Sequence, residues 1–95
     1  MTRRTKKATY VFRLYVTGES PRGTRTLNRL RAYCEDHFAG RYTLDVIDIY
    51  VRPKAAREAQ VVATPTLVKV FPLPARRFVG DLTGAKTLFG LELPR

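Results

Sequence analysis

The segment ATPTLVKVFP, residues 63 to 72, places a proline directly before a strand pattern. Residues 66 to 71 carry the bulky apolar side chains expected of a buried strand, which are Leu67, Val68, Val70 and Phe71. Pro65 has no backbone N–H to donate to a neighbouring strand, so its position needs an explanation. The alternatives are a cis peptide bond within a turn and a trans proline that begins an edge strand.

The amino-terminal half predicts a strand, a helix and a second strand. Residues 10–16 and 42–50 are two β-branched and aromatic runs. Between them, Ser20 and Pro21 are typical of a helix start, and Gly40 is typical of the position just past a helix end. Apolar residues repeat at helical spacing in this region, at Leu27, Leu30, Cys34 and Phe38. A strand, helix and strand in so short a segment predict a βαβ unit with parallel strands.

The carboxyl-terminal half predicts shorter elements. Pro53 begins a short helix in the segment PKAAREAQVV, and the strand at 66–71 follows. The segment PLP then forces a turn, and residues 75–81 predict a strand antiparallel to its predecessor, because the connection is too short for a crossover. Residues 82–93 predict a final helix, weakened by Gly84 and Gly90.

The order strand, helix, strand, helix, strand, strand, helix is that of a single thioredoxin-like α/β domain. In that fold a proline, usually in cis, precedes the third strand and turns the backbone beside the ligand site. This arrangement favours the cis form for the bond before Pro65.

Length and charge limit the classes of function. The 95 residues allow one domain, which we place at residues 10–95 after a basic arm at residues 1–9. The net charge of +10 predicts an acidic partner, although a solvated basic surface explains the charge equally well. No apolar run approaches the ~20 residues that span a bilayer, and we see no signal peptide, so we expect a cytoplasmic protein without a membrane.

The residues available for catalysis predict that the chain is not an enzyme. A redox enzyme of this fold needs a thiol at the start of the first helix, where this chain reads TGESP. Cys34 lies on the apolar stripe and is interpreted as a core residue. His37 has no nucleophile placed to use it as a base, and Asp45 and Asp48 are predicted to point to opposite faces of one strand. One cysteine and one histidine also leave too few ligands for a usual zinc site, so no metal or cofactor is expected.

Nucleic-acid binding is the alternative function. Arg22, Arg25 and Arg29 share one face of the predicted first helix. Four strand residues offer stacking surfaces for bases, namely Tyr10, Tyr15, Tyr42 and Tyr50. Tyrosines in apolar strands more often pack in the core, so nucleic acid is the less favoured partner.

The segments LYVTGESPRGTRTL, YTLDVIDI, ATPTLVKVFPLPARRFVGDLT and GLEL together resemble the KaiB family of circadian-clock proteins. The resemblance runs collinearly from about Tyr10 to Leu93. It implies a non-enzymatic regulator that binds the ring of a KaiC-type ATPase and modulates its phosphorylation and timing cycle, in a circadian or a stress-related system. It further implies competition with a sensor domain on a histidine kinase, and recruitment of KaiA.

The resemblance also implies two alternative folds for the second half of the chain. One is thioredoxin-like and binds KaiC, and the other is a ground state that forms dimers and tetramers. Matched position by position, the residues implied at the partner surface are Arg25, Lys69, Arg76 and Arg77. Those implied in the fold switch are Pro65, Gly90 and Glu92.

Overall fold

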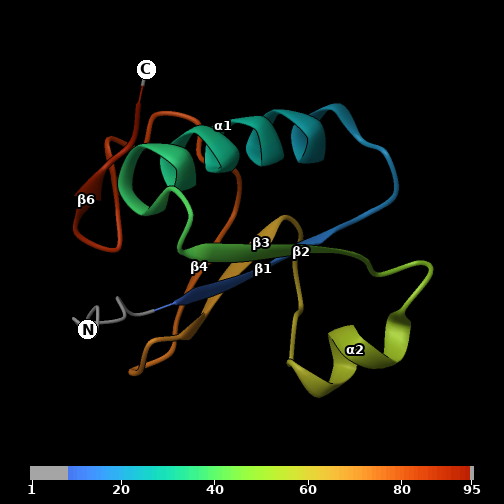
Figure 1. Ribbon diagram of the computed structural model, residues 1–95. Helices are drawn as coiled ribbons and strands as arrows, with labels where there is room; N and C mark the ends of the chain where they lie inside the picture. Colours follow the sequence, from blue (N-terminus) through green and yellow to red (C-terminus); the bar gives the residue numbers. More distant parts are fainter. Residues whose placement is uncertain (1–8, 95) are drawn as a thin grey trace.

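The computed structural model describes residues 9–94, so all but Thr9 of the predicted basic arm lies outside the described residues. The elements along the chain are β1 (Tyr10–Val16), α1 (Pro21–Phe38), β2 (Tyr42–Asp48), α2 (Pro53–Glu58), β3 (Thr66–Phe71), β4 (Arg76–Val79), β5 (Thr87–Leu88) and β6 (Leu91–Glu92). Helices α1 and α2 lie on opposite faces of the main sheet (Figure 1).

The main sheet has four strands in the order β2-β1-β3-β4. Strands β1 and β2 are parallel, as a βαβ unit requires, and β3 and β4 are antiparallel. Both predictions are confirmed. Strand β1 is central, and its Leu14 lies opposite Val46 of β2 on one side and Leu67 of β3 on the other.

Side chains of β1 point alternately to the two faces of the sheet, and both faces receive buried residues from this strand. Phe12, Leu14 and Val16 are buried in the core cluster that includes residues of α1. Tyr15 points the other way and is buried on the α2 side of the sheet. On the α1 side, the apolar stripe predicted from helical spacing contributes Leu30, Cys34 and Phe38 to the core.

The predicted final helix at residues 82–93 is wrong. Strands β5 and β6 form an antiparallel hairpin there, beside the carboxyl end of α1 (Figure 1). The residues that connect them, Phe89 and Gly90, have φ of 52° and 85°, and two positive φ values are typical of a type I′ hairpin turn. A right-handed helix needs negative φ at both positions. Buried Leu82, Leu88 and Leu93 attach this segment to the core.

Three other elements end earlier than predicted. Strand β4, predicted at residues 75–81, spans only Arg76–Val79. Strand β2 ends at Asp48, because the Asp48 carboxylate accepts the backbone N–H of Tyr50 at 2.9 Å and so favours a turn. Helix α2 ends at Glu58, shortly before Gln60, whose φ of 57° is not helical.

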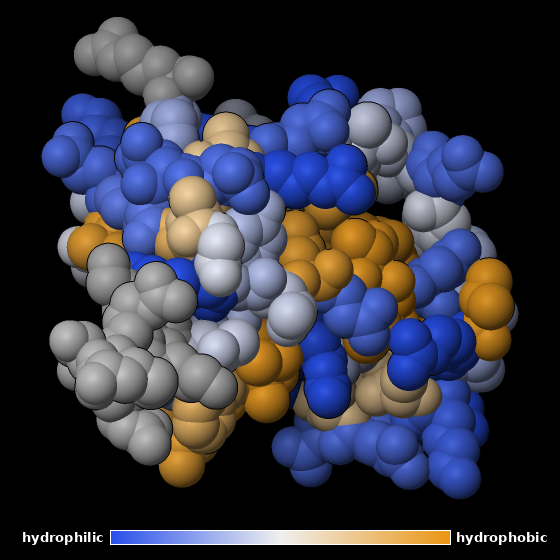
Figure 2. Space-filling model, in the orientation of Figure 1, coloured by the Kyte–Doolittle hydropathy of each residue, from blue (hydrophilic) through white to orange (hydrophobic). Residues whose placement is uncertain are grey.

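Apolar side chains remain partly visible between α1 and α2 (Figure 2). Edge strand β2 contributes to the exposed apolar surface through Val46, which is 37% exposed. Among residues 9–94, no helix has the length and apolar character needed to cross a bilayer.

Candidate functional site

The start of α1 and the proline before β3 form the place where a thioredoxin-like fold carries its ligand site. Ser20 caps α1, its hydroxyl accepting the Gly23 N–H at 3.0 Å. The Thr64–Pro65 peptide bond is cis, as the fold predicted. A hollow of about 200 Å³ between these segments is lined by Thr17, Thr64 and Pro65, among others. None of its lining residues is a cysteine, so this site has no thiol to react.

Cys34 lies in the core. It is fully buried, and burial, with a smaller contribution from Glu35, raises the pKa of its thiol to about 12. A thiol needs its thiolate form to act as a nucleophile. The interpretation of Cys34 as a core residue is confirmed, and its environment opposes redox chemistry.

Two of the four basic residues expected at the partner surface lie together. Lys69 of β3 and Arg76 of β4 are directly opposite in the antiparallel ladder, so their side chains share one face of the sheet. The Lys69 ammonium donates to the carbonyl oxygens of Pro72 and Pro74 at 2.6 and 2.9 Å, and it thereby holds the loop between the two strands. Arg76 is exposed.

The other two basic residues lie elsewhere. Arg77 is one position further along β4 and faces the α2 side, where its guanidinium donates to the carbonyl oxygens of Ala59 and Gln60. Arg25 lies on α1 and lines a hollow with Thr83 and Gly84. The four residues therefore do not form one cluster: Lys69 and Arg76 share a face of the sheet, whereas Arg77 points to the opposite face and Arg25 lies on α1.

The three residues expected in a fold switch are also separate in space. Pro65 is buried before β3, and its carbonyl accepts the Gly80 N–H at 2.8 Å. Gly90 lies in the turn of the β5–β6 hairpin, and Glu92 is in β6. Gly90 and Glu92 thus belong to the segment that departs from the expected helix.

Sequence reasoning missed a row of hydrogen-bond donors on α1, which we call the donor row: Arg29, Tyr33 and His37. Arg29 donates to the carbonyls of Leu82 and Ala85, the second at 2.7 Å. Tyr33 donates to Leu88 O and His37 to Glu92 O, each at 2.6 Å.

The spacing of the donor row was visible in the sequence, because residues four apart lie on one face of a helix. What it could not show was the acceptors. These are backbone carbonyls of a segment expected to be a helix, where such groups bond within the helix itself.

The tyrosines give little support to nucleic-acid binding. Tyr10 stacks on Phe38 with ring centroids 3.9 Å apart, and Tyr15 is buried. Tyr42 donates to the Glu35 carboxylate at 2.7 Å, and this hydrogen bond raises its pKa to about 12. Tyr50, at 74% exposed, is the tyrosine of the four that remains open for stacking.

These features place the chain in one class of protein: a thioredoxin-like domain without a thiol at the start of its first helix. The N-terminal domain of Synechococcus elongatus SasA has a TM-score of 0.68 to this chain at 22% identity, covering 87% of this chain and 80% of that one. Chloroplastic thioredoxin z has a TM-score of 0.65, also at 22% identity, covering 80% and 69%. Both likenesses concern the fold.

The sequence comparison identifies the family. The family model described as KaiB domain matches residues 13–91. The circadian clock oscillator protein KaiB of Prochlorococcus marinus (strain MIT 9312) is 47% identical over 88 residues, covering 92% of this chain and 84% of that protein. The KaiB of Synechococcus elongatus is also 47% identical over 88 residues, covering 92% and 86%. The chain belongs to the KaiB family, which confirms the resemblance and supports a regulatory role in a clock.

Proposed function

We propose that this chain is a non-enzymatic regulator that binds the ring of a KaiC-type ATPase and modulates its phosphorylation and timing cycle. The observation that carries the proposal is the KaiB match, which extends over residues 13–91 and so includes both halves of the fold. The absence of a cysteine beside the start of α1, together with the buried, protonated Cys34, supports binding over thiol catalysis.

The proposed contact with the ring is centred on Lys69 and Arg76. Arg76 is exposed on edge strand β4, and among the described residues its side chain has no hydrogen bond or ion pair that a partner would have to break. The net charge of +10 favours an acidic face on the partner, which would speed encounter and orient the complex. Arg25 and Arg77 are proposed to contribute from other faces, or through contacts made after the chain rearranges.

The test is a pull-down with a KaiC-type ATPase, with and without ATP. Arg76→Glu is the sharpest variant, because this side chain is exposed and its loss should leave the fold intact. We expect at least a tenfold loss of affinity, since reversing a charge at an interface typically costs more than ~1.4 kcal/mol. Lys69→Glu with Arg76→Glu should abolish binding, but Lys69 also holds the β3–β4 loop.

Arg31→Glu is the matched control, because it makes the same change of charge at an exposed position of α1. Deletion of residues 1–7 should matter little. Unchanged binding of Arg76→Glu, or equal losses for Arg76→Glu and Arg31→Glu, would contradict the proposed surface. Tight DNA binding at physiological salt that disappears with the arm would instead favour a nucleic-acid function.

We also propose that the second half exchanges between this thioredoxin-like arrangement and a ground state that forms dimers or tetramers. Pro65, Gly90 and Glu92 are proposed to set the balance. The thioredoxin-like form is proposed to compete with a histidine-kinase sensor domain for the ring, and to recruit KaiA where that protein is present. Two packings within a few kcal/mol are enough for such an exchange.

A further inference from the structure

A hollow lies between α2 and the sheet, on the face opposite α1. It has a volume of about 250 Å³, and Tyr15, Ile47, Ala55 and Ala59 are among the residues that line it. Helix α2 and its C-cap contribute Ala55 and Ala59 to this hollow, and their short side chains leave space that longer ones would fill. The hollow thus follows from the composition of α2, and its walls are partly apolar.

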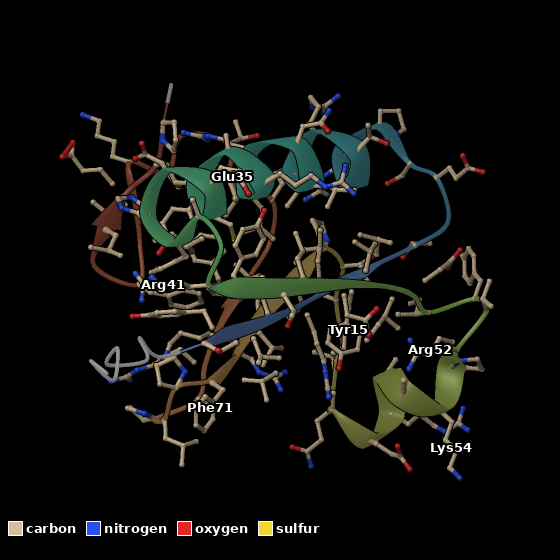
Figure 3. The ribbon with its side chains drawn as sticks, in the orientation of Figure 1. Tyr15, Glu35, Arg41, Arg52, Lys54 and Phe71 are labelled. Atoms are coloured by element: carbon tan, nitrogen blue, oxygen red, sulfur yellow. The ribbon has the colours of Figure 1, made fainter. Side chains whose placement is uncertain are left out.

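Tyr15 carries a hydroxyl without a partner in this hollow. Its side chain is 1% exposed, and among residues 9–94 no hydrogen bond to its oxygen occurs. Every fully buried side-chain nitrogen or oxygen in that range has a hydrogen-bond partner. The Tyr15 hydroxyl oxygen has none, so it must retain a small contact with solvent. A nearly buried hydroxyl that forgoes a hydrogen bond costs stability, unless something in the hollow supplies the bond. Figure 3 shows Tyr15 between the sheet and α2, with Arg52 near the start of the helix.

Charged residues of both signs line the same hollow as Tyr15. Arg13 lies two residues before Tyr15 on β1, so both side chains point to the same face. Asp45 and Arg52 also line the hollow, and they form a loose ion pair at 3.6 Å. Glu58 lines it from α2. Within the described part of the chain, neither the Arg13 side chain nor the Glu58 side chain has a hydrogen bond or an ion pair.

We propose that this hollow binds a small zwitterion of the amino-acid class. The carboxylate of the ligand contacts the Arg13 guanidinium and the Tyr15 hydroxyl, both of which are hydrogen-bond donors. Its ammonium group faces the Glu58 carboxylate. A small aliphatic side chain lies against Ile47, Ala55 and Ala59, where the wall is apolar. A simple anion would leave Glu58 unused, and a simple cation would leave Arg13 and Tyr15 unused.

The test is an NMR titration of the ¹⁵N-labelled chain with L-leucine and its two fragments. One fragment, 4-methylpentanoate, lacks the ammonium, and the other, isoamylamine, lacks the carboxylate. We expect L-leucine to shift the amide signals of residues 13–15, 45–47 and 52–59 to saturation. Each fragment should bind roughly tenfold more weakly or worse, because each loses a charge-assisted contact.

Tyr15→Phe separates binding from folding. Because the hydroxyl has no partner in the free chain, its removal should leave the melting temperature unchanged or higher, yet weaken leucine binding several-fold. Arg13→Gln and Glu58→Gln should each weaken it roughly tenfold, whereas Arg31→Gln on exposed α1 is the control and should not.

The proposal would be overturned by the absence of a saturable shift with L-leucine, by equal affinity for L-leucine and 4-methylpentanoate, or by unchanged affinity in Tyr15→Phe. Inorganic phosphate that saturates the same signals as tightly as L-leucine would also overturn it, by showing a site for anions. The titration uses the chain alone, so its outcome is independent of ring binding.

Discussion

Burial decides what Cys34 can do. The side chain is enclosed by the core cluster beneath α1, where a charged thiolate would lose its hydration. Burial accordingly raises the pKa of this thiol from 9.0 to about 12. A cysteine of ordinary reactivity would sit in a partly exposed, electropositive place such as the start of a helix. In this fold that place belongs to Ser20, which caps α1 instead.

We expect the folded chain to protect Cys34 from thiol reagents. Labelling by DTNB at about pH 8 should be no faster than unfolding, and denaturant should accelerate it, with free cysteine as the reference. Rapid labelling of the folded chain would contradict the burial of this thiol.

The same raised pKa predicts a loss of stability in alkali. The unfolded chain releases the thiol proton near 9.0, whereas the folded chain retains it until about 12, so the free energy of unfolding should fall as the pH rises between these values. Tyr33 and Tyr42, each raised from 10.0 to about 12, contribute in the same direction. Urea unfolding of Cys34→Ala should therefore show a shallower alkaline decline than the parent chain, and identical slopes would contradict this assignment.

At the scale of elements, the segment after β4 is held by α1 and by its own turn. The donor row of α1 satisfies four of its backbone carbonyls, at Leu82, Ala85, Leu88 and Glu92. These bonds compensate for the short strands β5 and β6, since an isolated hairpin of this length is marginal in water. The β5–β6 turn depends on Gly90, because glycine adopts a positive φ at little energetic cost, whereas residues with a Cβ do not.

Gly90→Ala should therefore destabilise this arrangement by roughly 1–2 kcal/mol, the cost of a left-handed conformation for an L-residue. The helix predicted for residues 82–93 would instead have been stabilised by this substitution, because alanine has a higher helix propensity than glycine. Gly90→Asn is the matched control, since asparagine tolerates this conformation and should cost less. Urea unfolding of the three proteins measures both effects. If alanine proves neutral or stabilising, the type I′ turn is not what holds this segment.

At the scale of the whole molecule, the β1–α1–β2 unit and the segment from Leu82 onward are stabilised by different interactions. The β1–α1–β2 unit contributes most of the buried apolar cluster, including Phe12, Leu14, Leu30 and Phe38. The segment from Leu82 onward adds three buried leucines and depends on hydrogen bonds to α1 for the rest. Free energies of local opening usually follow the density of buried contacts, so the halves should open separately.

Hydrogen exchange should resolve this difference. We expect backbone amides of residues 87–93 to exchange faster than those of residues 12–15. Tyr33→Phe should accelerate exchange of residues 87–93 further, because it leaves the buried Leu88 carbonyl without its donor. The free energy of local opening there should fall by roughly 1–3 kcal/mol, while exchange of residues 12–15 hardly changes. Tyr42→Phe is the control, because that hydroxyl bonds the exposed Glu35. Uniform acceleration over the whole chain would show that the two halves open as one unit.

Much of the fold was predictable because local patterns and tertiary packing agree in the first half. The β-branched and aromatic residues of β1 and β2 and the helical spacing in α1 predicted the βαβ unit, and the order of the elements predicted the thioredoxin-like class. Pro65 marked the start of β3, because a residue without an N–H restricts where a strand can begin. The lack of a thiol at the start of α1 was also a property of the sequence alone.

Tertiary structure decided the rest. Local propensity for residues 82–93 was weak in either direction, so buried Leu82, Leu88 and Leu93 and the carbonyls accepting from α1 selected a hairpin over a helix. Arg77 is separated from the Lys69–Arg76 pair because neighbouring residues of β4 point to opposite faces of the sheet, and Arg25 is separated because it lies on α1. The open space over Tyr15 likewise depends on how close α2 approaches the sheet. The sequence determined which elements can form, because apolar spacing, caps and turn residues act on the nearby backbone. Only packing between distant segments determined which side chains meet and which remain without a partner.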